Sequence, residues 1–303
     1  MFRTYLSGKE CCEFTRWDVR LWNHNEKQND FLYVRLGIGT IPFQAEISVP
    51  KDRFSIHKDE LASKPALIRD NYKNLLSVPV CLDIWKKGII GILGGAGKAG
   101  AYSVVYNMIA QLAANTSYTD VKMVFIYNKE NGSDEKWGFA KWLPHVWTEE
   151  RKMRLIASDK AELGDVCYEI AGVLRRRTEE NNSAKPYPLP HYVIFLDDME
   201  MLQGELLERI IYNPKPEYGI TTILLAERYE ELPNCCEDIV QNDGKNAAFY
   251  NVSNSSENSK DLVIETVSQE QLDTLARRLC DVEVNEVVGN GEIPNALDFL
   301  EMY

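Results

Sequence analysis

The alternation of short apolar runs with helix-type apolar spacing, which begins near Gly88, constrains the fold of this chain more than any other feature. Residues 88–93 form a continuous apolar run, as is typical of a strand buried on both faces. From Ala101 to Leu112, apolar side chains recur at the spacing of one helix face. This order predicts an α/β fold with a mostly parallel sheet that helices cover on both faces. Further strands are expected at residues 121–127, 191–198 and 221–226, and a second long helix at residues 163–174.

The N-terminal part shows a different pattern. Strands are expected at residues 31–37 and 43–49, around a Gly/Pro turn. A helix should follow at about residues 59–76, and another strand at 78–84. We therefore expect residues 1–85 to form a β-rich extension with one helix.

The C-terminal part predicts a small α+β finish. Residues 247–252 and 262–267 have the composition of a strand pair, separated by a polar loop. A helix should come next, because Ser268 and Gln271 have the spacing of a capping box. We assign this finish to a main domain at residues 86–303.

Residues 94–100, with the sequence GGAGKAG, lie between the first buried strand and the helix that follows it. This is the context of a P-loop, in which small residues let backbone N–H groups surround phosphate oxygens and the helix N-terminus adds its dipole. The candidate nucleotide-binding residues here are Gly94, Gly95, Gly97 and Lys98. The loop in this context predicts a P-loop NTPase-like fold.

Two positions depart from the P-loop pattern G-x-x-x-x-G-K-[ST]. Ile92 stands where the first glycine belongs, although Gly91 is one place away, and Ala99 stands where the Ser or Thr belongs. The second departure matters more, because that hydroxyl ligates the Mg²⁺ that bridges the nucleotide phosphates. Two interpretations stay open: a competent nucleotide site, or a P-loop-shaped turn with weak or no nucleotide binding. The sequence favours the second, so no cofactor or metal is expected, and Mg·ATP would bind weakly at most.

Residues 193–198, with the sequence VIFLDD, resemble a Walker B strand, an apolar run that ends in acidic residues. In working sites the first acid orients the metal and a following Glu activates water; Asp197 and Asp198 hold these places here. An apolar strand that ends in two aspartates is also common by chance. The loop and this strand, in the right order, are more specific together than either alone. We predict no catalytic residue.

The charge of the chain argues against nucleic acid as a partner. The chain has 34 Lys and Arg against 46 Asp and Glu, for a formal charge of −12. A nucleic-acid-binding protein usually carries the opposite sign, because phosphate neutralisation supplies most of its affinity. Residues 253–303 hold eleven acidic and three basic residues, so we expect this stretch to be solvated or to face a partner.

The cysteines, histidines and arginine clusters do not indicate a further site. The seven cysteines form no C-x-x-C pair and the four histidines are dispersed, so we expect reduced thiols in the cytosol. No run approaches 18 apolar residues, so no membrane span is expected. His145, among aromatic residues, should be a partly buried packing residue. Arg175, Arg176 and Arg177 should face solvent at the end of a helix and complement its dipole.

Short motifs spread over most of the chain resemble one family. They are Trp22, DFL at 30–32, VRLGIG at 34–39, VPV at 78–80, DVK at 120–122, WLPH at 142–145 and GEIPNALDFL at 291–300. Together they resemble the membrane-bound FtsK/SpoIIIE-type ATPases of type VII secretion, called EssC in Firmicutes and EccC in actinobacteria. The likeness is to the degenerate ATPase-like domain between the membrane segment and the tandem ATPase domains, and it covers about residues 22–303.

The resemblance implies a RecA/FtsK-type fold and a chain cut from a larger ATPase on the cytoplasmic face of the bacterial cell membrane. Its implied partners are the membrane segment and adjacent ATPase domains, other type VII secretion components and, indirectly, WXG-type substrates, in a protein that forms hexamers. Lys98 and Asp197 match the family's Walker positions but Ala99 does not. The family's catalytic residues are therefore not carried over, and the domain by itself is not expected to be an enzyme.

Three functions are compatible with these observations. The first is a non-hydrolysing module that couples the membrane part to the active ATPase domains and regulates them. The second is a slow ATPase that uses Lys98, Asp197 and Asp198, against which Ala99 argues. The third is a DNA motor by analogy with FtsK, against which the formal charge of −12 argues. We expect the first.

Overall fold

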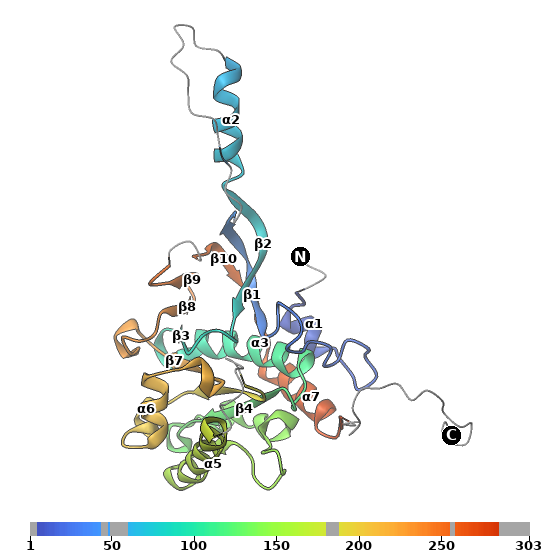
Figure 1. Ribbon diagram of the computed structural model, residues 1–303, viewed down its shortest axis with the longest axis vertical. Coiled ribbons are helices and arrows are strands. Elements are labelled where there is room, and N and C mark those ends of the chain that lie inside the picture. The colour runs from blue at the N-terminus through green and yellow to red at the C-terminus, as the bar shows by residue number, and fades with distance from the viewer. Residues whose placement is uncertain (1–4, 44–47, 49–59, 180–187, 255–257, 285–303) are drawn as a thin grey trace, which may run out of the picture.

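The computed structural model describes residues 5–43, 48, 60–179, 188–254 and 258–284. From β3 to β7, strands and helices alternate in the predicted order (Figure 1). The helices are α1 (Gly8–Cys12), α2 (Glu60–Asn71), α3 (Ala99–Asn115), α4 (Asp134–Trp137), α5 (Lys160–Glu179), α6 (Leu206–Tyr212) and α7 (Gln269–Leu279). The strands are β1 (Tyr33–Pro42), β2 (Asn74–Asp83), β3 (Ile89–Leu93), β4 (Val121–Ile126), β5 (Ile156–Ala157), β6 (His191–Leu196), β7 (Ile220–Ala226), β8 (Asp238–Asn242), β9 (Ala247–Asn251) and β10 (Lys260–Ile264).

Seven strands form the main sheet, in the order β5-β4-β6-β7-β3-β8-β9. Neighbouring strands are parallel except β8 and β9, which run antiparallel at one edge. Every residue of β3, β4, β6 and β7 is buried, as expected when elements pack on both faces of a parallel sheet. The predicted α/β fold with a mostly parallel sheet is confirmed.

Apolar side chains form one core on each face of this sheet. The first core joins α1, α3 and α7 to β1 and β2, and includes Phe31, Phe125 and Phe195. The second packs α5 and α6 against the opposite face, through side chains such as Val124 and Ile194. Figure 1 shows α5 and α6 on the far side of the sheet from the β1–β2 hairpin. Adjacent residues of one strand, such as Val124 and Phe125, thus enter different cores, because strand side chains alternate between faces.

A three-stranded antiparallel sheet, in the order β10-β1-β2, adjoins the first core. Its β1–β2 hairpin projects from the body of the molecule and leads to α2 (Figure 1). Contrary to prediction, the chain does not turn after residue 37, because β1 continues through Gly37 to Pro42 and pairs with β2. A Cβ at Gly37 would overlap the carbonyl oxygen of Val263. Glycine is needed here for close contact between strands, not for a turn.

Helix α2 is shorter than predicted. It ends at Asn71, because Asn74 already begins β2 and pairs with Pro42. Most of the strand expected at residues 43–49 lies outside the described residues, and so does the motif at 291–300.

The C-terminal strands do not form the predicted pair. β9 pairs with β8 in the main sheet, whereas β10 pairs with β1 in the three-stranded sheet. The sequence did not predict β8, which supplies β9 with a partner. α7 begins as predicted, with a capping box between Ser268 and Gln271. The domain boundary between residues 85 and 86 stays a prediction, although β10 joins the C-terminal part to β1.

Candidate functional site

The loop of residues 94–100 connects β3 to α3 at the carboxyl edge of the parallel sheet. Gly95, Gly97 and Lys98 have φ angles of 69°, 67° and 55°, in the left-handed region. The Lys98 N–H donates to the Gly95 carbonyl over 2.9 Å. Left-handed residues in such turns direct successive N–H groups toward one point, which is how P-loops bind anions. The strand, loop and helix therefore occur in the predicted order, whereas the phosphate-binding role of the loop stays a prediction.

A carboxylate of the protein contacts this loop. The Gly97 N–H donates to Glu227 Oε1 over 2.9 Å. Glu227 comes directly after β7, at the same edge of the sheet, and its own N–H donates to Glu231 Oε2 over 2.9 Å. Backbone N–H groups of a working P-loop bind phosphate oxygens. The Glu227 carboxylate and a phosphate would therefore compete for the same amide.

The Lys98 ammonium contacts Asp197, which comes directly after β6. Its Nζ lies 3.3 Å from Asp197 Oδ1 and also donates to the Asp197 main-chain oxygen. The second carboxylate oxygen, Oδ2, accepts from the Tyr102 hydroxyl at 2.7 Å and from the Trp137 indole N–H at 2.9 Å. The Asp197 side chain is 3% exposed, and a buried carboxylate needs such donors. Both of its oxygens are therefore engaged by side chains of the protein.

Tyr102 and Trp137 connect this aspartate to an aromatic cluster. Tyr102 lies one helical turn after Lys98 on α3, and its ring centroid is 5.8 Å from that of Trp137. Trp137 in turn lies 5.3 Å from Phe125. Burial, and secondly the charge of Asp197, raise the pKa of Tyr102. Its hydroxyl therefore keeps its proton at neutral pH and donates to the carboxylate.

Asp198 and Ala99 take no part in the Lys98–Asp197 contact. Asp198 caps a short 3₁₀ helix: its Oδ1 accepts from the Glu200 N–H at 2.9 Å, and its Oδ2 accepts from Asn131 Nδ2 at 3.1 Å. Ala99 is exposed as the first residue of α3. The structure thus brings Gly97, Lys98 and Asp197 together, whereas the Asp198 carboxylate is bound to other partners.

The other glycines near the loop serve close packing. Gly94 is buried, and a Cβ there would overlap the start of α3. Gly91 and Ile92 both lie within β3, so neither residue belongs to the loop. A Cβ on Gly95 would lie 3.4 Å from Asp243, whose pKa is held below its usual range by backbone N–H groups, first that of Asn246. Asp243 therefore adds a second negative charge beside the loop.

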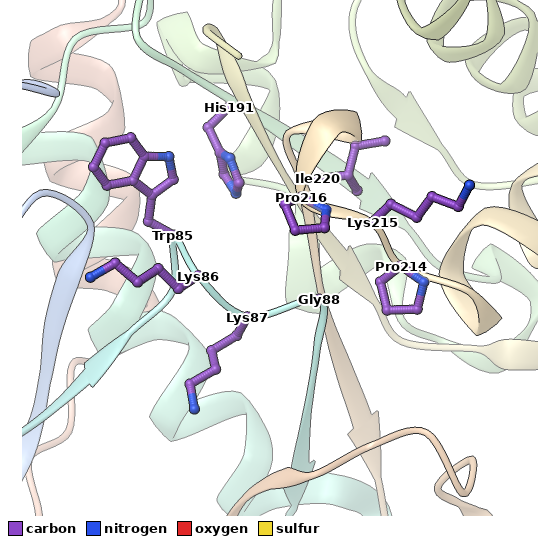
Figure 2. A pocket seen from close by; sticks show the side chains of 9 residues that line it. All are labelled: Trp85, Lys86, Lys87, Gly88, His191, Pro214, Lys215, Pro216 and Ile220. Atoms are coloured by element: carbon purple, nitrogen blue, oxygen red, sulfur yellow. The ribbon is translucent and has the colours of Figure 1, made fainter. Parts of the chain in front are cut away.

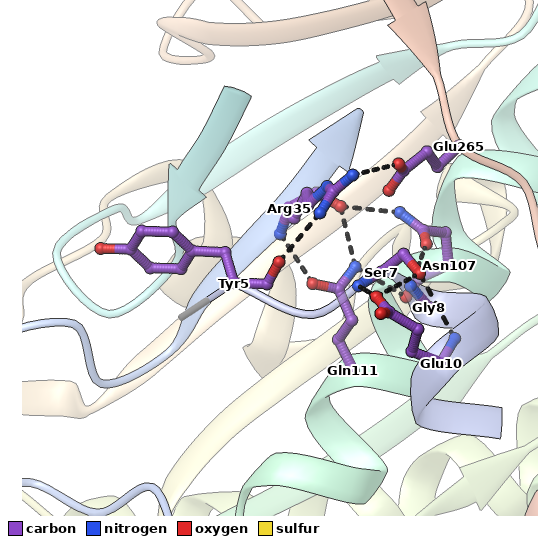
Figure 3. Close-up of polar contacts among 8 residues, drawn as sticks. All are labelled: Tyr5, Ser7, Gly8, Glu10, Arg35, Asn107, Gln111 and Glu265. Atoms are coloured by element: carbon purple, nitrogen blue, oxygen red, sulfur yellow. Dashed lines mark hydrogen bonds and ion pairs between the residues drawn. The ribbon is translucent and has the colours of Figure 1, made fainter. Parts of the chain in front are cut away.

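The middle of α3 is joined to the N-terminal part of the chain by buried amides (Figure 3). The Arg35 N–H donates to Gln111 Oε1 at 2.7 Å, and the Arg35 carbonyl accepts from Asn107 Nδ2 and Gln111 Nε2, each at 2.8 Å. Asn107 Oδ1 also accepts from the Gly8 N–H of α1 at 3.1 Å. The Arg35 guanidinium forms an ion pair with Glu265, which follows β10. One helix therefore carries the loop at its amino end and holds β1 and α1 at its middle.

Sequence reasoning missed Glu227, Asn107 and Gln111. The two amides did carry a signal, because they stand four residues apart in an otherwise apolar helix and so share one buried face. Glu227 carried none, since it is 130 residues from the Gly97 amide that it contacts.

His145 is a packing residue, as predicted, but it is fully rather than partly buried. Its Nε2 lies 2.8 Å from the carbonyl oxygen of Thr116, the C-cap of α3, and its ring lies edge-on to Trp22. Burial lowers the pKa of His145 to about 4. The carboxyl end of α3 is thus held by a neutral histidine.

The prediction for the three consecutive arginines is right for two of them. Arg175 and Arg176 are exposed, but the Arg177 guanidinium turns inward and donates to the carbonyl oxygens of Tyr218 and Pro190. The prediction is wrong for Arg177 because these two carbonyls, which precede β7 and β6, lie within its reach.

All seven cysteines are free thiols. In that part of the chain, no group of three or more His, Cys, Asp or Glu side chains is placed to hold a metal ion. None of the described helices is both long and apolar enough to cross a membrane.

Comparison with known proteins finds similar proteins from secretion systems. No protein-family model matches the chain. The chain is 27% identical over 225 residues to the ESX secretion system protein YukB of Bacillus subtilis (strain 168), covering 70% of this chain and 14% of YukB. It is 22% identical over 294 residues to the type VII secretion system protein EssC of Staphylococcus aureus (strain NCTC 8325 / PS 47), covering 94% of this chain and 19% of EssC.

A solved structure shares the fold. It is the cytoplasmic domain of the type VII secretion ATPase EccC of Thermomonospora curvata, which superposes with a TM-score of 0.56 at 16% sequence identity. The match covers 89% of this chain and 33% of that chain. The structural likeness supports the α/β fold. The sequence similarity to YukB and EssC is the evidence for homology.

Proposed function

Because the chain is homologous to the EssC, EccC and YukB proteins of type VII secretion, we propose that it is a non-hydrolysing coupling and regulatory module of a protein-export motor. It would link the membrane part of a longer protein to active ATPase domains. The chain spans only 14% of the length of YukB and 19% of that of EssC. The rest of these relatives is long enough to contain a membrane part and further ATPase domains. The observation that carries the proposal is that carboxylates bind the Gly97 amide and the Lys98 ammonium.

Three features support the lack of hydrolysis. The Gly97 N–H is bound to Glu227 and the Lys98 Nζ to Asp197, so two groups that would bind phosphate oxygens already have anionic partners. Ala99 offers no oxygen to Mg²⁺. Both oxygens of Asp197 accept hydrogen bonds. A metal at Asp197 would have to displace those donors.

Helix α3 supplies the physical connection for coupling. Lys98 precedes its first turn, Asn107 and Gln111 bind the backbone of β1 and α1 from its middle, and His145 binds its C-cap. Leaving a buried donor or acceptor unsatisfied costs about 1–3 kcal/mol. A displacement of the loop end of α3 would therefore move the three-stranded sheet with it rather than break these contacts.

The proposed partners follow from the same homology. They are the adjacent ATPase domains and membrane segment of the parent protein, other type VII secretion components and, indirectly, WXG-type substrates. The parent protein would form a hexamer, with this chain on the cytoplasmic face of the bacterial cell membrane. We do not expect nucleic acid as a partner, given the formal charge of −12.

A slow ATPase is the second candidate, and the left-handed loop with Lys98 close to Asp197 favours it. In that case Lys98 would contact phosphate, Asp197 would orient Mg²⁺ and Asp198 would activate water. The last role conflicts with the hydrogen bonds of Asp198 to Glu200 and Asn131. We therefore rank this candidate below the coupling module.

Substitutions in the full-length parent protein test the proposal. Lys98→Ala should leave ATP turnover unchanged, because other domains supply it. Gln111→Leu, which keeps the volume but removes the amide, should reduce export while turnover persists. Gln203→Leu is the matched control, since Gln203 is exposed, and near-ultraviolet circular dichroism checks folding. A loss of most turnover in Lys98→Ala would contradict the proposal.

A further inference from the structure

The β1–β2 hairpin and α2 form an arm that carries exposed apolar side chains. Leu67, Ile68 and Tyr72, on and directly after α2, are 58%, 54% and 64% exposed, and Leu76 of β2 is 72% exposed. Figure 1 shows this arm projecting away from the main sheet. Large apolar side chains that gather on an exposed surface mark a site of contact with a protein or a membrane. The arm is therefore a candidate binding surface, separate from the loop of residues 94–100.

The apolar side chains of the arm do not share one side of α2. Leu67 and Ile68 are consecutive, so their side chains point about 100° apart around the helix axis. The Tyr72 N–H donates to the Ile68 carbonyl over 3.0 Å, which places Tyr72 one turn beyond Ile68. A rigid protein surface would cover one side of the helix and leave the other exposed. A lipid surface is fluid, so it can surround the helix and cover both sides.

The arm differs in charge from the rest of the molecule. Residues 60–76 hold three basic and two acidic residues, although the chain as a whole has a formal charge of −12. Lys64, Arg69 and Lys73 are exposed. The contact between Arg69 Nε and Asp70 Oδ1, at 3.0 Å, is itself exposed, so it contributes little. Anionic lipids attract basic side chains of this kind.

The hairpin holds α2 away from the acidic body of the molecule. Residues 74–78 of β2 are exposed or half-buried, and the buried part of the strand begins at Pro79. Four steps along a strand span about 13 Å, whereas charges in physiological salt are screened over about 8 Å. Acidic residues near the main sheet therefore oppose the approach of α2 to a negative surface only weakly.

The cavity at the amino ends of β3, β6 and β7 lacks such accessible charges. It has a volume of about 230 Å³, and its lining includes Trp85 and Pro216. Figure 2 shows the Lys215 side chain directed away from this space. The unpartnered Nδ1 of His191 is covered by protein atoms. Neither of these two polar groups can therefore contact a ligand in the cavity, whereas the basic groups of the arm are open to solvent.

We propose that the arm binds the surface of an anionic lipid bilayer. Its apolar side chains enter one leaflet at the level of the headgroups, and its three basic side chains contact lipid phosphates. Helix α2 has twelve residues, which span about 18 Å, so it is too short to cross a hydrocarbon core of about 30 Å. This binding goes beyond the coupling role and does not depend on ATP turnover.

Cosedimentation of the wild-type chain with lipid vesicles tests the proposal. One set of vesicles contains equal parts of phosphatidylglycerol and phosphatidylcholine, and the other contains phosphatidylcholine alone. We expect the chain to sediment with the anionic vesicles at low salt and to be released at high salt, because salt screens the basic side chains. Failure to sediment with the anionic vesicles, or equal sedimentation with both kinds, would overturn the proposal.

Matched substitutions locate the lipid contact. Tyr72→Ser should weaken binding to the anionic vesicles at least about fivefold, because less apolar surface enters the lipid. Tyr168→Ser is the control, since Tyr168 is 82% exposed on α5, and it should bind like wild type. Lys73→Gln should also weaken binding about fivefold, whereas Lys152→Gln, at a side chain 78% exposed outside the arm, should not. Equal losses in the arm variants and their controls would refute the assignment to the arm. The vesicle comparison on wild-type protein decides the question even where a variant fails to fold.

Discussion

The two ends of α3 differ in what their polar groups bind. At the amino end, the loop contains residues at positive φ, and Gly97 and Lys98 bind the carboxylates of Glu227 and Asp197. In the middle, buried amides of α3 bind the backbone of other elements, and at the carboxyl end a neutral histidine from outside the helix contacts the carbonyl oxygen of its C-cap, Thr116. The conformation of a glycine-rich loop and its ability to bind phosphate are therefore separable. Glycines at positive φ set the shape, whereas the partners of each N–H and ammonium group set the chemistry.

The largest expected effect is on the ion pair between Arg35 of β1, whose backbone binds the middle of α3, and Glu265. The two side chains are 7% and 21% exposed. Arg35→Met leaves the carboxylate without its partner and should lower the free energy of unfolding by about 4 kcal/mol. Urea denaturation measures this. Arg16→Met is the control, because the ion pair of Arg16 with Asp281 is half exposed and its loss should matter far less. Equal effects of the two substitutions would show that the burial of the Arg35–Glu265 pair adds nothing to its contribution.

The second largest effect is expected on acidification, which should lower the free energy of unfolding through His145 at the carboxyl end of α3. The pKa of His145 is 6.5 as a free side chain and about 4 in the folded protein. Below pH 6.5 the unfolded chain therefore binds more protons than the folded one, and stability falls as pH falls. The loss should be about 1.4 kcal/mol per pH unit, or roughly 3 kcal/mol between pH 6.5 and 4.

The variant His145→Gln separates this effect from general acid denaturation. Glutamine can still donate to the Thr116 carbonyl but does not titrate in this range, so urea midpoints should fall less steeply between pH 6.5 and 4. His191, with a pKa lowered to about 3, keeps part of the dependence. An unchanged slope in His145→Gln would show that this end of the helix does not titrate as described.

At the amino end, Lys98→Met should lower the free energy of unfolding by about 1.5 kcal/mol, because a buried carboxylate loses a charged donor. Asp197 keeps its bonds from Tyr102 and Trp137, which limits the loss. Lys129→Met is the matched control, since the Lys129–Asp159 pair is 49% and 35% exposed; its midpoint should not move. If Lys98 did not stabilise Asp197, neither variant would lower the free energy of unfolding.

The smallest effect is expected for Ala99→Ser. The new hydroxyl restores one residue of the P-loop pattern at an exposed position, yet Ile92 and Asp198 still depart from it. We expect no measurable phosphate release from Mg·ATP, and no change in the melting temperature. Turnover in this single variant would show that the missing hydroxyl alone inactivates the loop.

The strand, loop and helix around Lys98 could be predicted because their signals are local. A continuous apolar run, a glycine-rich loop and a helical face stand next to one another between Gly88 and Leu112. β8 could not, because only Ile239 and Val240 are apolar in a strand of five residues. The turn predicted after residue 37 failed because Gly37 meets Val263, a neighbour that the sequence alone does not reveal.

The positions of Lys98 and Asp197 could be predicted, but the hydrogen-bond partners of the site residues could not. Glycine spacing identified Lys98, and the apolar strand that ends in two acids identified Asp197. Nothing local indicated that Tyr102 and Trp137 would bind the second oxygen of Asp197, or that Glu227 would bind the Gly97 amide. Such contacts depend on how distant strands align at one edge of the sheet, which residue spacing does not encode.

Calorimetry of the wild-type chain with Mg·ATP shows whether the loop of residues 94–100 binds nucleotide. Because Gly97 and Lys98 are bound to carboxylates, we predict no heat of binding at millimolar nucleotide, and no difference between wild type and Lys98→Ala. Binding with a micromolar dissociation constant that disappears in Lys98→Ala would contradict the account, since it would show that nucleotide displaces Glu227 and Asp197 from the loop.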